Sequence, residues 1–471
     1  MLIHLFGGNW SQSVCAHALD CAITDAARLH VITHEEEALI KRAFYSDDFA
    51  RSYLSIGEAE SSITALVNHL EQYGFFLLKF VSNSHDLEQC LPLKIRHPDF
   101  ADIRNSPSTT SVLGLDWHVK QDAFRFSIDV DDFNVTTKRE LLSTVASIYD
   151  PLGMINFAIA PAKLLVQQCF REGLAWDEEL PDHIMGEIHA WKTKLSTLES
   201  LVFPRRISDL LSPHLEHHLH VFADGSQFIF AANAFVRTVG SCGSITVRLL
   251  AAKTRLAPLK SLTIPRMELS ACLLASRLAT FIKKEHDIVF VTSTFWTDST
   301  SSLGVIRNVK TRYSVYVGHR QAEIQTLTDI DSWRHVPSHL NPADGLTRGR
   351  FPDPAEDDPY FGGPAFLRLP PNLWPSEPDR CYDEHVDPAE IRREQHVMLT
   401  ATAAPFDLID DYLPKFDTLP RLFNAVAWLL RFASFCRDRQ HVERSPIITV
   451  SELRDSELAI IRVVQRKAYP D

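Results

Sequence analysis

The chain has 471 residues, of which 45% are hydrophobic and 23% are charged, a composition that is ordinary for a soluble globular protein. Its length exceeds what one hydrophobic core serves, so we expect three or four domains. The formal net charge of −12 argues, on global grounds, against a nucleic-acid-binding protein. The most apolar stretch, residues 422–435, is interrupted by Arg431 and is too short for a membrane span.

The first hundred residues predict helices that are separated by a tight turn. We expect a helix near residues 14–29 and a second, amphipathic helix that ends at Gly74. Between them, the sequence FYSDD predicts a hairpin turn that carries Asp47 and Asp48. The apolar run FFLLKFVS, at residues 75–82, predicts a strand.

The next part of the chain changes from short strands to helices. Residues 101–135 predict a connector with two short strands, LGLDWHV and AFRFSI. From Thr137 onward the periodicity predicts two helices, which Pro151 and Gly153 separate. This helical region is expected to end near residues 204–206.

Residues 218–349 predict a compact α/β unit. Three successive runs, HLHVFADGS, FIFAANAFVR and SITVRLLAA, indicate an antiparallel start to a sheet. A helix follows from Pro265 to about Lys284, and the runs DIVFVTSTFW and SWRHVP predict two later strands. Further helices are expected to open at Asp298 and at Asn341.

The last part of the chain predicts an extended segment followed by helices. Residues 351–390 are rich in Pro, Asp and Gly, which is typical of a linker. Helical patterns return at residues 417–436 and 451–468.

Cysteine usage and the N-terminal sequence bear on the cellular compartment. The eight cysteines are scattered, without a CxxC pair or a zinc-like spacing. The N-terminal sequence lacks the basic and apolar regions of a signal peptide. We therefore expect reduced thiols in an intracellular protein, cytoplasmic or nuclear.

Four acidic residues suggest a chemistry, namely Asp224, Glu268, Asp298 and Asp344. Each lies at the end of a strand-like run or near the start of a helix-like one, so that the fold can bring them together. Two-metal hydrolysis of a phosphodiester needs several such carboxylates, and Mg²⁺ prefers oxygen ligands. Each residue taken alone is more often a turn, capping or helix-dipole residue. Their joint order favours a catalytic site in which all four hold two Mg²⁺ or Mn²⁺ ions.

The distribution of charge reverses the global argument locally. Residues 237–284 contain nine Lys or Arg residues and one acidic residue, Glu268. A basic face around a carboxylate suits an enzyme that acts on a phosphate backbone, although it can also be a solvated surface. We expect Lys253, Arg255 and Arg266 to contact nucleic acid.

Several segments resemble the Pao/BEL-type LTR retrotransposon polyproteins. The connection region of that family is similar to TKRELLSTVASIYDPLGMINFAIAPAKLLVQQ and to GLAWDEELP. Its palm turn and primer-grip strand are similar to FYSDD and GFFLLKFVSN. Its ribonuclease H domain is similar to IPRMELSAC, FWTDSTSSLGVI and HVPSHLNPADGLTRG. The sequences FGGPAFLRLPPNLWP and TVSELRDSELAIIRVVQ resemble the segment that leads to an integrase zinc module.

This resemblance implies a multidomain protein of α/β and α+β class. The expected parts are the end of a reverse-transcriptase palm and thumb (1–100), a helical connection (101–211), a ribonuclease-H-like mixed sheet flanked by helices (212–350), a linker (351–400) and a truncated, helical pre-integrase segment (401–471).

The implied function is that of a retrotransposon pol polyprotein fragment that hydrolyses the RNA strand of RNA/DNA hybrids. The expected binding partners are the RNA/DNA hybrid and other parts of the polyprotein, and no membrane is expected among them. Because the fingers and the first palm Asp are lacking, we expect Asp47 and Asp48 to be a polymerase-turn remnant without activity from this chain alone. An exposed turn is the alternative for that pair. For the whole chain, the alternatives are a catalytically inert remnant or interaction module, and an aspartic-type peptidase, which the family label suggests but no Asp-Thr/Ser-Gly motif supports.

Overall fold

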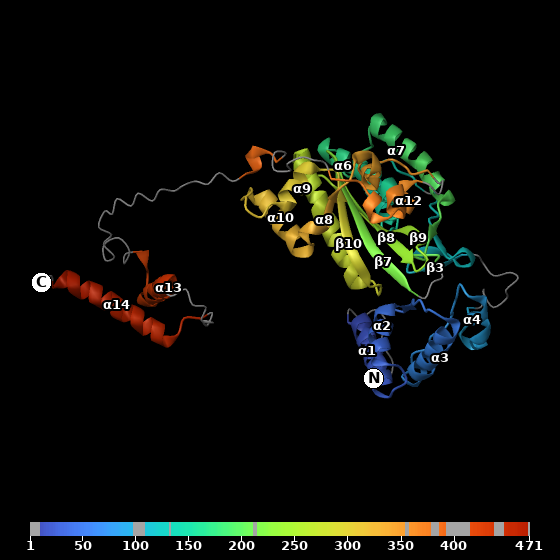
Figure 1. Cartoon of the computed structure of the whole chain (residues 1–471), viewed down its shortest axis with the longest axis horizontal. Coiled ribbons are helices and arrows are strands. Elements are labelled where there is room, and N and C mark those ends of the chain that lie inside the picture. Colours follow the sequence, from blue (N-terminus) through green and yellow to red (C-terminus); the bar gives the residue numbers. More distant parts are fainter. Residues whose placement is uncertain are drawn as a thin grey trace. The chain divides into compact units, whose positions relative to one another are not determined.

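A computed structural model of the chain describes eight stretches, namely residues 10–97, 109–130, 133–210, 214–353, 358–377, 386–391, 415–437 and 447–469. The chain divides into two compact units, Met1–Arg392 and Arg393–Asp471, which are described separately (Figure 1). Within the described stretches, no helix is both long and apolar enough to cross a membrane.

The N-terminal part of the first unit is a small helical cluster. Its helices are α1 (Ser11–Arg28), α2 (His34–Ala43), α3 (Ile56–Gln72) and α4 (His85–Cys90). Both expected helices are confirmed, since Ile23 of α1 and Leu66 of α3 are buried in one apolar cluster with Ile40 of α2. The FYSDD sequence forms the expected hairpin: strands β1 (Phe44–Tyr45) and β2 (Asp48–Phe49) pair antiparallel, with Asp47 and Asp48 exposed.

The strand expected at residues 75–82 is wrong. The structure has a single bridge there, from Phe80 to Arg96, and no strand. Phe75 and Leu77 pack against the helices, whereas Phe76 and Leu78 are largely exposed. Burial thus alternates along this segment as it does in a strand, but a strand also needs a neighbouring ladder, and the described residues offer none.

A helical layer follows the two short strands that the sequence predicted. A four-stranded antiparallel sheet runs in the order β3 (Thr109–Val112), β4 (Leu115–His118), β5 (Ala123–Arg125), β6 (Phe203–Pro204). The expected helices are α5 (Lys138–Ser147) and α6 (Asn156–Arg171), and a further helix, α7 (Asp182–Leu195), was not anticipated. A capping box of Thr137 and Glu140 begins α5.

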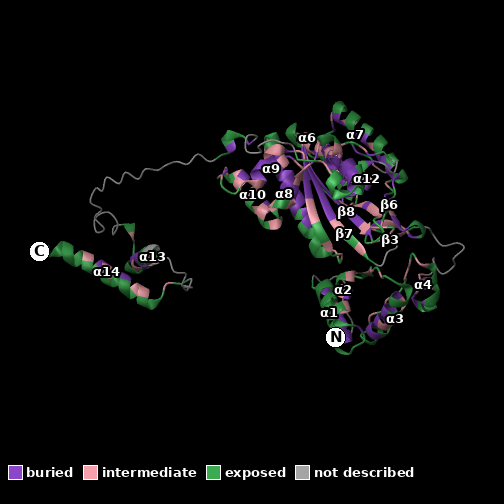
Figure 2. Cartoon of the chain, viewed as in Figure 1, coloured by how far each residue is buried: buried purple, intermediate pink, exposed green. Residues whose placement is uncertain are grey.

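The loop between α5 and α6 is pressed against the large sheet of the unit. Gly153 has φ +76°, and a Cβ atom there would lie 1.8 Å from the backbone oxygen of Ala252. The Asn156 side chain donates a hydrogen bond of 3.1 Å to the same oxygen. This contact joins the helical layer to the sheet in one hydrophobic cluster (Figure 2).

The large sheet has five strands, in the order β11-β10-β7-β8-β9. The strands are β7 (Leu215–Gly225), β8 (Ile229–Gly240), β9 (Ile245–Leu256), β10 (Phe290–Thr297) and β11 (Trp333–His335). The first three form the expected antiparallel start, and β10 pairs parallel with both β7 and β11. The flanking helices are α8 (Ile264–Glu285), α9 (Thr300–Arg307), α10 (Val315–Leu327) and α11 (Pro342–Thr347).

The two faces of this sheet bury different sets of side chains. Leu219 and Val221 pack with apolar side chains of α8, as the period of two along a strand allows. Phe222, on the opposite face, packs with Trp296 and Phe366. The described parts of residues 351–390 therefore cover the sheet with short helices, including α12 (Pro359–Gly362), instead of running as a free extended segment.

The described residues of the second unit, 415–437 and 447–469, form two helices, as the sequence predicted. They are α13 (Leu419–Arg437) and α14 (Val450–Ala468). Leu422 and Val426 of α13 pack against Ile460 of α14. A capping box of Thr449 and Glu452 begins α14.

Candidate active site

Two of the predicted carboxylates leave the large sheet at the same edge. Asp224 is the penultimate residue of β7, and Asp298 follows directly after β10. The parallel register pairs Ala223 with Thr297, one residue before each of them. Because neighbouring strands lie about 4.8 Å apart, the two acidic residues are neighbours across the strand ends.

The third carboxylate, Glu268, lies near the start of α8, which abuts the end of β7. At Gly225, a Cβ atom would lie 2.5 Å from the backbone nitrogen of Glu268 and 2.6 Å from the carbonyl carbon of Met267. Only a residue without a side chain permits this approach of strand and helix. Gly225 thereby allows Glu268 to approach Asp224.

We expect the substitution Gly225→Ala to destabilise the chain by about 1 to 3 kcal/mol, because the added methyl group collides with helix backbone that cannot rotate away. Urea unfolding of the full chain measures this change. Gly186→Ala is the matched control, since a Cβ atom there meets nothing within 4 Å in α7. The control should stabilise the helix by up to about 1 kcal/mol. Equal changes in the free energy of unfolding for the two variants would contradict the close approach of β7 and α8 at Gly225.

The fourth carboxylate, Asp344, lies in α11 and forms an ion pair of 2.7 Å with Arg348. Asn341 begins this helix, where its side-chain oxygen accepts a hydrogen bond of 3.2 Å from the Ala343 amide. The side-chain nitrogen of Asn341 donates to the backbone oxygen of Ala223 (3.0 Å) and to Asp298 (3.4 Å). A single buried amide thus joins α11, β7 and Asp298.

Replacing Asn341 with Ala should cost about 2 to 3 kcal/mol of stability, because the change removes a helix cap and leaves the buried Ala223 carbonyl without its donor. Asn341→Asp separates the two effects, since it keeps the cap but loses the donor and adds a charge beside Asp298. Chemical denaturation at pH 7 should show both variants to be destabilised. If Asn341→Asp unfolded at the same denaturant concentration as wild type, the hydrogen bond from Asn341 to the Ala223 backbone oxygen would contribute nothing to stability.

The site disfavours negative charge when no cation is present. Burial raises the pKa of Asp224 to about 6, with Asp298 and Asp344 adding to the rise and the Thr347 hydroxyl opposing it. Burial also raises the pKa of Glu268 to about 7, and the charges of Asp298 and Asp224 act in the same direction. A like charge nearby raises the pKa of a carboxyl group, and Asp298 acts in this way on both Asp224 and Glu268. The strand register, the contact at Gly225 and the hydrogen bonds of Asn341 place these three residues at the same strand ends, with Asp344 on the adjoining helix α11.

Each of the four carboxylates has a polar partner: three accept hydrogen bonds from hydroxyl groups, and Asp344 is paired with a guanidinium. Thr347 donates to Asp224, Ser299 donates to Glu268 and Ser338 donates to Asp298. Among the residues that the structure describes, no three His, Cys, Asp or Glu side chains are arranged as a metal-ligand group. The donor chemistry nevertheless fits a hard divalent cation, since all four residues offer carboxylate oxygens and, within the described stretches, only Asp344 forms an ion pair with a cationic side chain, that of Arg348.

The partners of the carboxylates were only partly foreseen from the sequence. Ser299 was expected as a cap of α9, and its hydroxyl does accept the Ser302 amide at 3.1 Å. Its second role, as the donor to Glu268, was not foreseen, and neither were the roles of Ser338 and Thr347. The signal that could have revealed these donors is that each is a Ser or Thr residue within a few positions of Asp298 or Asp344 in the sequence.

The other predicted site residues lie elsewhere. Lys253 and Arg255 are exposed on β9, an edge strand of the large sheet. The Arg266 guanidinium forms a two-pronged ion pair with Glu390. Asp47 and Asp48 lie on the β1–β2 hairpin, outside the sheet that carries the four carboxylates.

The comparison with protein families gives one match, and the search of curated proteins gives none. Residues 137–299 match the family described as the Pao retrotransposon-like RNaseH-like domain. The matched segment includes α5 to α7, strands β7 to β10 and three of the four carboxylates. Asp344 lies outside it.

Several solved structures are similar to part of the chain. RNase H1 from the halophilic archaeon Halobacterium salinarum is 17% identical over 28% of this chain and 96% of its own, with a TM-score of 0.21. LC11-RNase H1 in complex with an RNA/DNA hybrid is 16% identical over 27% and 92%, with a TM-score of 0.21. The foamy viral protease-reverse transcriptase in complex with double-stranded DNA is 14% identical over 65% and 48%, with a TM-score of 0.36.

The family match and the mixed five-stranded sheet with its flanking helices confirm the ribonuclease-H-like part of the expected fold. The palm and thumb expected at residues 1–100 stay a prediction. Residues 137–299 of the chain are thus similar to the Pao retrotransposon-like RNaseH-like domain.

Proposed function

We propose that the chain is a fragment of a retrotransposon pol polyprotein and that its four carboxylates hydrolyse the RNA strand of RNA/DNA hybrids. The observation that supports this best is the meeting of Asp224, Glu268, Asp298 and Asp344 at one sheet edge, where the pKa values of the first two are raised. Perturbed carboxylates that converge in this way are typical of functional sites.

In this proposal the four acids hold two Mg²⁺ or Mn²⁺ ions. Such ions, when bound, activate a water molecule and stabilise the leaving 3′ oxygen. The chain's own contribution is to orient the ligands: Asn341 and Ser338 hold Asp298, and Ser299 holds Glu268. Ser299 and Asn341 are the N-cap residues of α9 and α11, and Ser338 begins the 3₁₀ turn before α11, so the arrangement of the helices sets the geometry of the acids.

The hybrid would lie against basic residues two strands away from the carboxylates. Lys253 and Arg255 are exposed on β9, at the level of Asp224 on β7, and are available to phosphate groups. A contact from Arg266 requires its ion pair with Glu390 to open. The hairpin with Asp47 and Asp48 is proposed as a remnant of a polymerase palm, without polymerase activity from this chain alone. Other parts of the polyprotein are proposed partners, inside the cell.

The direct test uses the full chain and a hybrid whose RNA strand is labelled. We expect the RNA strand to be cut with Mg²⁺ or Mn²⁺ and to stay intact with EDTA, whereas single-stranded RNA should stay intact in both. Divalent ions should also raise the melting temperature, because a ligand that binds only the folded state stabilises it.

The rival proposal is a catalytically inert remnant or interaction module, and the hydroxyl groups that now occupy the carboxylates favour it. A folded chain that neither cuts the hybrid nor gains thermal stability from Mn²⁺ would establish the rival. An aspartic-type peptidase would instead digest protein substrates at acid pH under pepstatin control, and no observation favours it.

A further inference from the structure

Residues 386–391, here named the clasp, attach a distant part of the chain to the large α/β region. Val386 is buried in the same apolar cluster as α8 and Tyr313. Ile391 forms an antiparallel bridge with Tyr313, and the Ser314 amide donates a hydrogen bond of 2.7 Å to the backbone oxygen of Glu390. The clasp is therefore held by backbone and side chains together.

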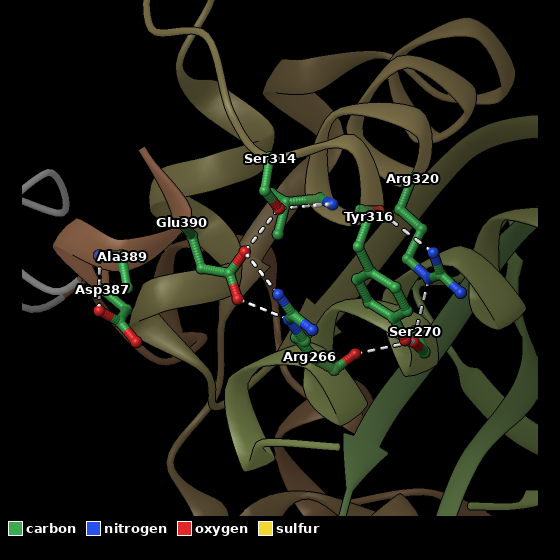
Figure 3. Close-up of polar contacts among 9 residues, drawn as sticks. Arg266, Ser270, Ser314, Tyr316, Arg320, Asp387, Ala389 and Glu390 are labelled. Carbon is green, nitrogen blue, oxygen red and sulfur yellow. Dashed lines mark hydrogen bonds and ion pairs between the residues drawn. The ribbon is translucent and has the colours of Figure 1, made fainter. Parts of the chain in front are cut away.

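Glu390 is the centre of the clasp (Figure 3). Its carboxylate accepts two hydrogen bonds from the Arg266 guanidinium, of 2.5 and 3.2 Å, and a third of 2.6 Å from the Ser314 hydroxyl. Glu390 is only 8% exposed. The bonds from Arg266, ahead of all other causes, lower the pKa of Glu390. A two-pronged pair whose carboxylate is buried holds its partners more firmly than a fully exposed ion pair does.

Arg266 lies in the first turn of α8, two residues before Glu268. This helix begins without a side-chain cap, since Thr263 makes no capping hydrogen bond, and its first turn contains no acidic residue. A negative charge near a helix start stabilises it, and the Glu390 carboxylate supplies one from outside the helix.

A layer of side chains supports Arg266 from the other side (Figure 3). The Tyr316 ring lies 4.9 Å from the Arg266 guanidinium and 3.5 Å from that of Arg320. The hydroxyl groups of Tyr316 and Ser270 are 2.9 Å apart, and Ser270 also donates to the Arg266 backbone oxygen. The first turn of α8 is thus fixed between the clasp and α10.

We propose that Glu390 is a positioning residue for the candidate active site: by holding Arg266, the clasp fixes the first turn of α8 and with it Glu268. This inference rests on the proposed function for its consequence, since Glu268 is one of the four proposed metal ligands. It extends the working nuclease beyond residue 350 to residue 391. Loss of the clasp, for example through a cut between residues 377 and 386, would weaken the metal site.

A matched control pair exists on the same helix. Arg277 of α8 forms a two-pronged pair with Glu323 of α10, with hydrogen bonds of 2.6 and 2.9 Å. The side chains of this pair are 58% and 39% exposed, and Arg277 is three turns along α8 from Arg266. Breaking it removes the same chemical contact without touching the first turn.

The experiment compares Glu390→Gln with Glu323→Gln in the full chain. Amide hydrogen exchange without metal reports on the first turn of α8, and a Mn²⁺ titration of the melting temperature reports on the metal site. Glu390→Gln should speed exchange at residues 266–270 and weaken Mn²⁺ binding by about tenfold or more, as the loss of a ligand's supporting partner does. Glu323→Gln should change neither. In a double-mutant cycle, adding Arg266→Gln to Glu390→Gln should cause little further loss.

Unchanged exchange at the start of α8 in Glu390→Gln, or the same effect from Glu323→Gln, would overturn the inference. Failure of the proposed function has a different signature, because wild-type chain would then neither bind Mn²⁺ nor cut the hybrid. The exchange comparison between the two variants would still decide whether the clasp holds the turn.

Discussion

Replacing Asp298 with Asn should abolish metal-dependent cleavage of an RNA/DNA hybrid and leave the fold intact. The amide of Asn can still accept the hydrogen bond from the Ser338 hydroxyl, so the local packing is preserved. It loses the negative charge with which a carboxylate holds a divalent ion. Since loss of a mere supporting partner costs 10- to 100-fold, loss of a ligand should lower the rate by at least about 100-fold.

Cleavage of labelled hybrid by the full chain, at several Mg²⁺ concentrations, measures this loss. Asp331→Asn is a suitable control, because Asp331 is exposed on the 3₁₀ turn before β11 and should be silent. Melting curves without metal should be alike for both variants. Cleavage by Asp298→Asn at the wild-type rate would remove Asp298 from the proposed site and leave the nuclease proposal without support.

The second large effect concerns pH. Raised pKa values of about 6 for Asp224 and about 7 for Glu268 mean that the folded, metal-free chain keeps protons that the unfolded chain has already lost. The form that binds more protons is favoured at low pH, so these two groups make the stability fall as the pH rises from about 4 to about 7. A divalent ion must displace the same protons, so its affinity should rise over the upper part of this window.

Urea unfolding of wild-type chain and Asp224→Asn at pH 5 and pH 8 isolates one of the two groups. The variant should gain stability relative to wild type by up to about 2 kcal/mol between these pH values, because one raised pKa unit corresponds to about 1.4 kcal/mol. For wild type, Mn²⁺ should bind at least about tenfold more tightly at pH 7.5 than at pH 5.5, as proton displacement requires. The raised pKa values would be contradicted if two results were found together. The free energies of unfolding of wild type and Asp224→Asn would differ by the same amount at both pH values, and the affinity of wild type for Mn²⁺ would not change with pH.

The clasp changes how the boundary of the proposed nuclease is understood. Composition alone assigned residues 351–390 to a linker, because Pro, Asp and Gly are common there. The described parts of this region instead contribute Tyr360, Phe366 and Val386 to three buried clusters. A fragment that ends near residue 350 would expose the apolar surfaces that these side chains cover, and it would lack Glu390.

Local signals in the sequence determined most of the secondary structure around the site. The period of two in HLHVFADGS predicted β7, and the helix start at Pro265 predicted α8, because both depend on neighbouring residues alone. The order of the acidic residues along these elements predicted that the fold can bring Asp224 and Asp298 together, and the structure supplies the means, because β7 and β10 pair parallel. The sequence also indicated the hairpin at FYSDD.

Only the tertiary structure decided which distant groups touch. The run FFLLKFVS is apolar like a strand, but it has no ladder partner among the described residues. Helix α10 escaped prediction because only Val317 and Ile324 are buried in it, too few to give a periodic pattern. The hydroxyl donors to the carboxylates, the close contact at Gly225 and the Glu390–Arg266 pair join residues far apart in the chain. Such contacts depend on how the elements pack against one another, and the conformational preferences of neighbouring residues do not determine that packing.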